Sequence, residues 1–203
     1  MTQDALREQA QEQFDESAAK LEERLSDQDF LANRGLGNEV GIHVFCYDPT
    51  LELQARKLFA RLRAKADSGA LPCRIIERNL YDILIDICKE KRIFDSIPRQ
   101  EEKRGTQALV DQLQKVATPS LFAQKLVDEQ PQPGDVLLIT GVGEVYPVLR
   151  AHVLLDNLQP LISEIPVVVA YPGIYNGQTL QLFAGATSRG SMDGNYYRAF
   201  RLV

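Results

Sequence analysis

The stretch from Asp135 to Thr140 reads DVLLIT, an apolar run that no polar residue interrupts. A second run of this kind, PVVVAY, covers residues 166–171, and a helical pattern from about Pro147 to Asn157 lies between the two. Strands whose residues do not alternate between apolar and polar are typical of parallel sheets that are covered on both faces. Two such strands joined by a helix form a right-handed βαβ unit. The two stretches therefore predict a parallel sheet at the centre of an α/β domain.

Strand and helix patterns elsewhere in the chain extend this unit. Short β-prone runs cover 42–47 and 74–77, and the tail 195–203 is expected to form a strand at the sheet edge. Helical patterns cover about 49–65, 79–87, 109–116 and 121–127. Residues 95–105 carry dense charge of both signs and are expected to form an exposed connection. We therefore predict a three-layer α/β fold with a mostly parallel sheet of four or five strands and flanking helices.

The beginning of the chain differs in charge from the rest. Residues 1–32 are expected to form an acidic amphipathic helical arm before an α/β domain of residues 40–203. Nine acidic and three basic residues lie in 1–30, whereas the remainder is close to neutral, and the formal net charge is −5. The apolar residues of the arm recur at helical steps: Leu6, Ala10, Phe14, Ala18, Leu21 and Leu25. This apolar stripe must be covered either by the protein's own domain or by another protein.

Composition excludes several classes of protein. The 203 residues suit one medium domain, and 44% apolar with 25% charged residues is ordinary for a globular chain. No stretch approaches the ~20 apolar residues of a membrane span, and the polar N-terminus does not resemble a signal peptide. Three cysteines, Cys46, Cys73 and Cys88, lie in apolar runs without CxxC spacing, which is typical of reduced core residues. We expect a cytoplasmic protein that does not contact a membrane.

The polar residues do not form a recognisable catalytic pattern. His43 lies within a strand pattern and His152 on a helix, without HxxxH or HExxH spacing. No GxSxG motif is present, since Gly190-Ser191-Met192 lacks the second glycine. The inventory therefore predicts no catalytic residues, no metal site and no cofactor.

A glycine-rich turn, TGVGEVYP, follows the first buried strand at residues 140–147. In an α/β sheet ligands bind at the carboxyl ends of strands, so Gly141, Gly143, Glu144 and Tyr146 form a possible ligand loop. The GxGxxG fingerprint fails because Tyr146 stands where a third small residue is needed, and no Walker A motif occurs. Two interpretations remain: a tight strand-to-helix turn, or a loop that binds a polar ligand with the help of a cation. The second would suit a P-loop-like nucleotide-binding domain without Walker A.

Aromatic residues gather after the second buried strand and near the C-terminus. Tyr171 and Tyr175 flank a Pro-Gly turn, and Tyr196, Tyr197 and Arg198 form a second cluster. Tyrosine and arginine are frequent in interface hot spots, so these five residues are the predicted partner-binding set. Strand alternation would place one tyrosine of each pair in the core.

Five basic residues lie within ten positions of the first domain helix: Arg56, Lys57, Arg61, Arg63 and Lys65. Apolar residues alternate with them at helical spacing, which favours the solvated face of an amphipathic helix. A surface for phosphates or an acidic partner is the other interpretation, and it would make the protein a nucleic-acid-binding module.

Three segments together resemble one family. They are DVLLITGVGEVYPVLRAHVLLDNLQP at 135–160, VVVAYPGIYNGQTLQLF at 167–183, and the terminal NYYRAFRLV. In combination they resemble the BrxB family, a component of bacterial BREX phage-defence systems. The resemblance is closest over residues 135–203 and extends back to about residue 40.

The resemblance implies cytoplasmic action inside a multi-protein complex that contains a DNA methyltransferase, a large ATPase and PglZ, a protein of the phosphatase superfamily. The resemblance supplies no established activity and no catalytic residues for this chain. We therefore expect a non-catalytic adaptor that binds another BREX protein, PglZ in the first place, and that meets nucleic acid only through the complex. The competing hypotheses are the nucleotide-binding domain and the nucleic-acid-binding module described above. The sequence fixes neither the strand order nor the oligomeric state.

Overall fold

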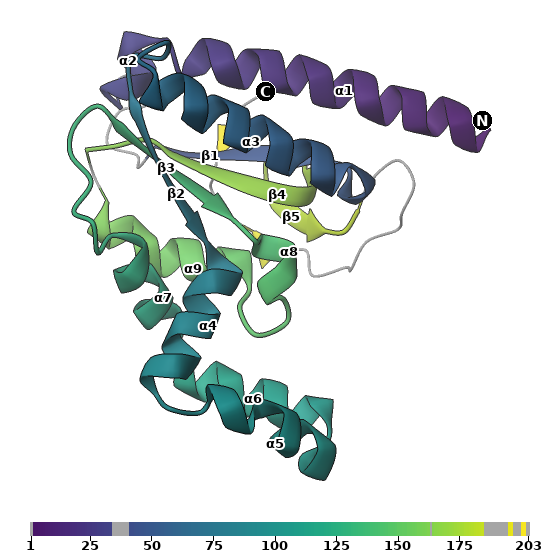
Figure 1. The fold of residues 1–203 in the computed structure, drawn as a ribbon. Coiled ribbons are helices and arrows are strands. Elements are labelled where there is room, and N and C mark those ends of the chain that lie inside the picture. Colours follow the sequence, from purple (N-terminus) through teal and green to yellow (C-terminus); the bar gives the residue numbers. More distant parts are fainter. Residues whose placement is uncertain (1, 34–40, 163, 185–194, 197–199, 202–203) are drawn as a thin grey trace.

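A central sheet organises the molecule in a computed structural model that describes residues 2–33, 41–162, 164–184, 195–196 and 200–201 (Figure 1). Its five parallel strands lie in the order β2 (Arg74–Asn79), β3 (Asp135–Thr140), β4 (Val167–Tyr175), β1 (Ile42–Tyr47) and β7 (Phe200–Arg201). Two short antiparallel strands, β5 (Thr179–Leu182) and β6 (Asn195–Tyr196), continue from the end of β4. The predicted α/β fold with a mostly parallel sheet is confirmed.

The middle of the sheet is buried on both faces, as the unbroken apolar runs predict. All six residues of β3 are buried. Val136 and Leu138 belong to the hydrophobic cluster on one face, whereas Leu137 and Ile139 belong to the cluster on the other face. Because β3 and β4 pair in parallel, they form the predicted βαβ unit.

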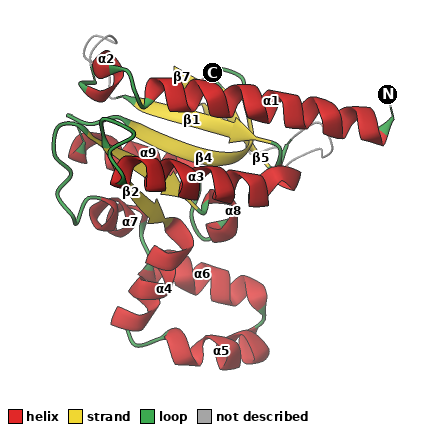
Figure 2. Cartoon of the chain, turned by 45° about the horizontal axis from the view of Figure 1, so that its top comes forward, coloured by secondary structure: helices red, strands yellow, loops and turns green. Residues whose placement is uncertain are grey.

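One face of the sheet is covered by α1 (Gln3–Arg24), α2 (Gln28–Leu31) and α3 (Glu52–Asp67), the last preceded by a short 3₁₀ turn, η1 (Pro49–Leu51) (Figure 2). The apolar stripe of α1 packs on this face, where the rings of Phe14 and Phe45 meet edge to face at 5.8 Å. The structure thus decides between the two alternatives for the stripe: the protein's own sheet covers it.

The opposite face is covered by α4 (Leu80–Glu90), α7 (Pro119–Leu126) and α9 (Ala151–Leu158), and α9 continues into η3 (Gln159–Leu161). The Asn79 side chain caps α4 by accepting hydrogen bonds from the backbone N–H groups of Tyr81 and Asp82. The helix expected from about Pro147 begins only at Ala151, and a separate turn of helix, α8 (Val142–Val145), precedes Pro147. Pro147 itself lies between the two helices.

Residues 94–116 extend from α4 as two helices that stand away from the sheet (Figures 1 and 2). A 3₁₀ turn, η2 (Phe94–Ser96), leads into α5 (Ile97–Arg104), and α6 (Thr106–Val116) follows. The prediction of an exposed connection over 95–105 is wrong in conformation, since most of it is helical. Pro98 is tolerated there because the first turn of a helix needs no N–H donor, and no residue of α5 is buried.

Candidate functional site

The carboxyl ends of the parallel strands meet at one edge of the sheet, called the carboxyl edge below. It includes the loop after β3 and the hairpin formed by β4 and β5. Two of the predicted site sets, the glycine-rich loop and the tyrosines of β4, therefore lie next to one another.

Close packing explains both glycines of the loop. Gly141 adopts a left-handed conformation with φ 77°, and a Cβ atom there would lie 2.5 Å from Oδ1 of Asn79. A Cβ atom on Gly143 would lie 2.9 Å from the Phe183 ring and 3.1 Å from the Pro172 ring. The following helix, α8, has only four residues. These contacts support the tight turn, and they leave the cation-assisted ligand loop without a supporting observation.

Glu144 takes part in a chain of contacts that crosses the carboxyl edge. It accepts hydrogen bonds from Nη2 of Arg56 at 2.5 Å and from Nδ2 of Asn79 at 3.4 Å. Arg56 also donates from Nε to Glu52 at 3.0 Å, and the Tyr47 hydroxyl donates to the same carboxylate at 2.7 Å. Hydrogen bonds to Glu52 and Glu144 raise the pKa of Arg56. The cation that pairs with Glu144 is therefore Arg56, a residue of the protein itself.

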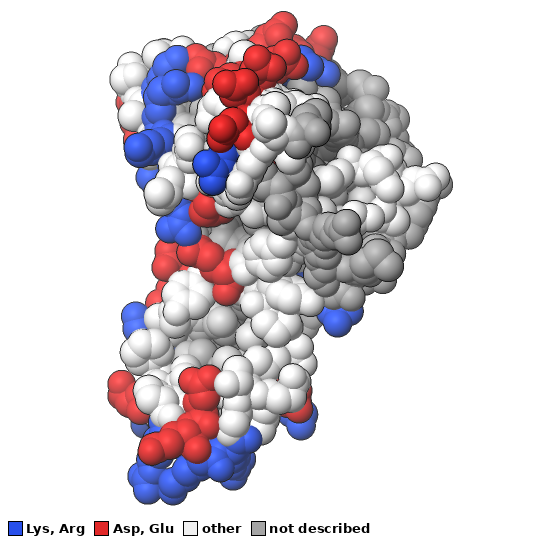
Figure 3. Space-filling view, turned by 90° about the vertical axis from the view of Figure 1, so that its right-hand side faces the viewer, with Lys and Arg blue, Asp and Glu red and all other residues white. Residues whose placement is uncertain are grey.

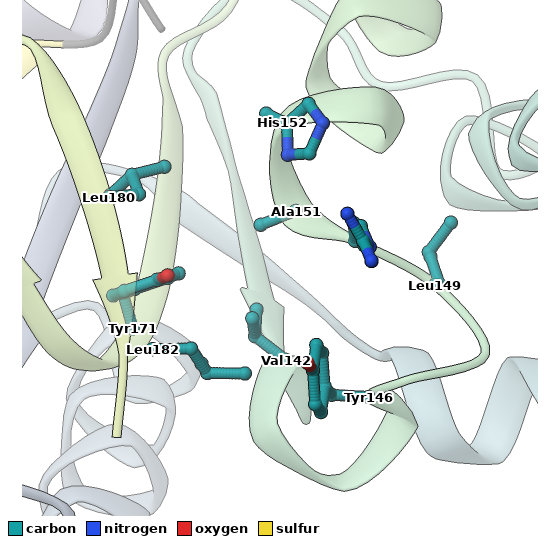
Figure 4. Close-up of a pocket in the computed structure, with 9 residues that line it drawn as sticks. Val142, Tyr146, Leu149, Ala151, His152, Tyr171, Leu180 and Leu182 are labelled. Carbon is teal, nitrogen blue, oxygen red and sulfur yellow. The ribbon is translucent and has the colours of Figure 1, made fainter. Parts of the chain in front are cut away.

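A pocket of about 390 Å³, including the space open to solvent, lies beside this loop (Figure 4). Tyr146 and Tyr171 come from opposite walls, so the structure brings together one residue from each predicted set. Arg150 and His152, at the start of α9, also line it. The remaining lining residues are apolar: Val142, Leu149, Ala151, Leu180 and Leu182. Sequence reasoning missed Arg150 entirely, because nothing in its neighbourhood signals that α9 begins at this edge.

The predicted partner-binding tyrosines of β4 are core residues. Tyr171 is 3% exposed and Tyr175 is 2% exposed, as part of the cluster that faces α9. The exposed large apolar side chains of the hairpin are Ile174, at 44%, and Phe183, at 37%, whose ring lies 6.2 Å from that of Tyr146. At this strand end, Ile174 and Phe183 therefore contribute the apolar surface, and Tyr171 and Tyr175 do not.

The second predicted aromatic cluster is only partly described. Tyr196 lies in β6, which pairs with β5. Tyr197 and Arg198 lie outside the described residues. The role of this cluster stays a prediction.

The basic residues of α3 lie on its exposed side, and carboxylates from distant segments pair with most of them. Nε of Arg63 lies 2.9 Å from the Glu77 carboxylate. Arg61 and Lys65 both pair with Glu22 of α1, Arg61 at 3.8 Å. Together with the pairs of Arg56, these contacts leave Lys57 as the member of the set without a carboxylate partner in the described ranges. The arrangement supports a solvated helix face.

The remaining polar residues of interest, His43 and Cys73, are partly or fully buried. Burial, together with the charge of Arg24, lowers the pKa of His43 to about 4, and burial raises the pKa of Cys73 to about 11. Within the described residues, no three His, Cys, Asp or Glu side chains come close enough to hold a metal ion. Among the helices of those residues, none combines the length and the apolar character that crossing a bilayer requires.

Comparisons with known proteins agree on one family. The sequence model of the family described as "BREX protein BrxB" matches residues 76–202. A protein of that description from Bacillus cereus (strain H3081.97) is 34% identical over 186 residues, which cover 89% of this chain and 92% of the relative. Another, from Escherichia coli O9:H4 (strain HS), is 36% identical over 192 residues, 91% of this chain and 89% of the relative. No solved structure gives a significant match.

Proposed function

This chain belongs to the BrxB family of BREX components, and on that premise we propose that it is a non-catalytic adaptor that binds another BREX protein through its carboxyl edge. Family membership itself supports a role in phage defence. The adaptor role and the choice of partner are the proposal.

The observation that carries the adaptor role is the exposed apolar surface of the β4–β5 hairpin. Ile174 and Phe183 each expose more than a third of their surface, and Phe183 lies against the half-buried Tyr146. Protein interfaces are anchored by aromatic and large apolar side chains that fill pockets on the partner. The pocket beside Tyr146 offers a complementary hollow for one such side chain of the partner.

PglZ is the partner that we expect at this surface, because the BREX complex implied by the family contains it. Binding would happen in the cytoplasm, where the components of a BREX system must meet the phage genome. The contact would bury the exposed side chains of the hairpin without requiring any chemistry from this chain.

Co-purification of the tagged full-length chain from cells that express the whole BREX system tests the proposal. The informative variant is Ile174→Asp with Phe183→Asn, because both side chains are exposed and asparagine tolerates the left-handed conformation of residue 183, φ 59°. We expect PglZ to be lost from the purified complex, while the variant stays folded.

Leu161→Asp is the matched control, since Leu161 is 47% exposed but lies in η3, beyond the far end of α9. It should leave the association intact. Retention of PglZ and every other BREX protein by the double variant would refute the carboxyl edge as the binding surface.

A further inference from the structure

The two helices that stand away from the sheet enclose a groove that the proposed function does not use. Six side chains line this groove, called the α5 groove below: Ser96, Arg99, Gln100, Lys103, Arg104 and Gln112. Its volume is about 920 Å³ including the space open to solvent. No carboxylate and no apolar residue belongs to this lining. Figure 3 shows Lys and Arg side chains gathered at the tip of this end of the molecule, with Asp and Glu side chains beside them.

The three cations of the groove are available to a ligand. Within the described part of the chain, Arg99, Lys103 and Arg104 have no carboxylate within ion-pair distance. The acidic side chains of the same helices, Glu101, Glu102 and Asp111, do not belong to the lining. Glu101 accepts a hydrogen bond from Thr106 at 2.8 Å, and Asp111 accepts one from Gln107 at 2.9 Å.

The spacing of the cations suits a row of anions. Arg99 and Lys103 are four residues apart in α5, so they lie on one face of the helix. The three cations span about 7.5 Å along the axis of α5, and the phosphates of one strand are spaced every ~3.4 Å along the axis of a duplex. The groove can therefore meet about two or three consecutive phosphates.

We propose that the α5 groove binds the phosphodiester backbone of nucleic acid without reading its sequence. Phosphate contacts in proteins are made by Arg and Lys together with Ser and Gln, which are the residue types of this lining. A protein partner would need an aromatic or apolar anchor, and the groove supplies none. The inference goes beyond the adaptor role, and it places direct contact with nucleic acid on α5 and not on α3, where the alternative interpretation of the sequence had placed it.

If each of the three cations neutralises one phosphate, the binding has a defined salt dependence. The logarithm of the association constant should fall with the logarithm of the salt concentration with a slope of about −2.7, which is about −0.9 for each phosphate. A contact of this size is weak by itself, so it adds to binding that the rest of the complex provides.

Fluorescence anisotropy with a labelled mixed-sequence duplex of about 20 base pairs tests the proposal, over roughly 25–200 mM salt. The variant is Arg99→Gln with Lys103→Gln and Arg104→Gln in the full-length chain. Its matched control, Lys57→Gln with Arg61→Gln and Arg63→Gln, removes the same charge from α3. We expect the groove variant to bind at least about tenfold more weakly at the lowest salt, with a slope near zero. The control should bind like the unmodified protein.

Several outcomes would overturn the proposal. If the unmodified protein does not bind at the lowest salt, or if the groove variant binds equally well, the groove is not a phosphate site. An equal loss in the α3 control would show that overall charge, rather than the groove, governs binding. Groove-dependent binding of a polyglutamate peptide without binding of the duplex would identify an acidic protein segment as the ligand instead.

Discussion

The helices α3 and α5 both carry a concentrated set of basic residues, but only those of α3 pair with carboxylates in the described part of the chain. Four of the five cations of α3 pair with carboxylates, several of them from segments far away in the sequence. The three cations of α5 line a groove without a carboxylate. A count of basic residues therefore does not show where a protein can bind an anion. The carboxylates that the fold brings near each cation decide it.

The two helices also differ in how they are held. α3 buries Ala55, Leu58, Phe59 and Leu62 against the sheet. α5 buries no residue and contacts mainly α6. A helix with few buried apolar contacts opens more easily, so the α5 groove can adjust to a ligand at little cost in global stability.

The largest expected difference between the two helices concerns stability. Leu62 is 1% exposed, so Leu62→Ala should lower the free energy of unfolding by about 3 kcal/mol, through lost burial and a residual cavity. Ile97→Ala in the first turn of α5 should cost less than about 1 kcal/mol, because Ile97 is only partly buried. Urea unfolding followed by circular dichroism measures both. Equal losses would show that α5 is as firmly packed as α3.

Lowering the pH should destabilise the layer that contains α3, and His43 is the residue responsible. This residue packs on Phe30, and its pKa in the folded protein is lowered from 6.5 to about 4. Because the unfolded chain binds the proton more readily, the stabilisation is fully present above the unfolded pKa and is lost as the pH falls toward 4. We expect the free energy of unfolding to be about 2 kcal/mol lower at about pH 5 than at about pH 7.5.

Urea unfolding across this pH range, on the unmodified protein and on His43→Gln, measures the effect. The variant should lose most of the pH dependence between about pH 5 and about pH 7.5. His152→Gln is the control and should keep it. A pH dependence that survives in His43→Gln would assign the effect to other groups.

The smallest expected effect on stability comes from removing the carboxylates that pair with α3. Glu22→Gln, Glu77→Gln and Glu144→Gln together should cost less than about 1 kcal/mol per pair, because the basic partner of each pair is more than a third exposed. Binding should change more clearly. In a chain that already carries the three α5 substitutions, these changes should restore salt-dependent duplex binding by releasing Arg61, Arg63 and Lys65, whereas Arg56 keeps its pair with Glu52.

The control for this experiment is Glu8→Gln with Glu12→Gln and Glu16→Gln, which changes the charge equally on the exposed side of α1. It should restore little binding, since no cation is released. If both sets of changes restore binding to the same extent, overall charge explains the difference between α3 and α5, and ion pairing does not.

Much of the fold could be predicted from local patterns. The unbroken apolar runs at β3 and β4 indicated a doubly covered parallel sheet, and Asn79 indicated the start of α4. The helix over 97–104 was missed because α5 has no apolar stripe, which is the signal that reveals most helices. It forms because α6 packs beside it, a tertiary contact that local patterns do not contain.

The sequence predicted where the candidate site lies, but not which of its side chains are exposed. The sequence placed it after β3 and β4, and the structure has Tyr146 and Tyr171 lining one pocket there. It could not show that Tyr175 is buried while Ile174 is exposed, because the hairpin with β5 was not expected. The predicted tyrosines thus indicated the right strand end but not the exposed side chains.

The sequence by itself determined the class of fold, the family and the strand ends at which polar residues gather, because hydrophobic periodicity and turn residues act between near neighbours in the chain. Only the tertiary structure decided which cations stay available and which aromatic residues reach the surface. Those properties depend on contacts between residues far apart in sequence, such as Arg56 with Glu144, which neither periodicity nor composition encodes.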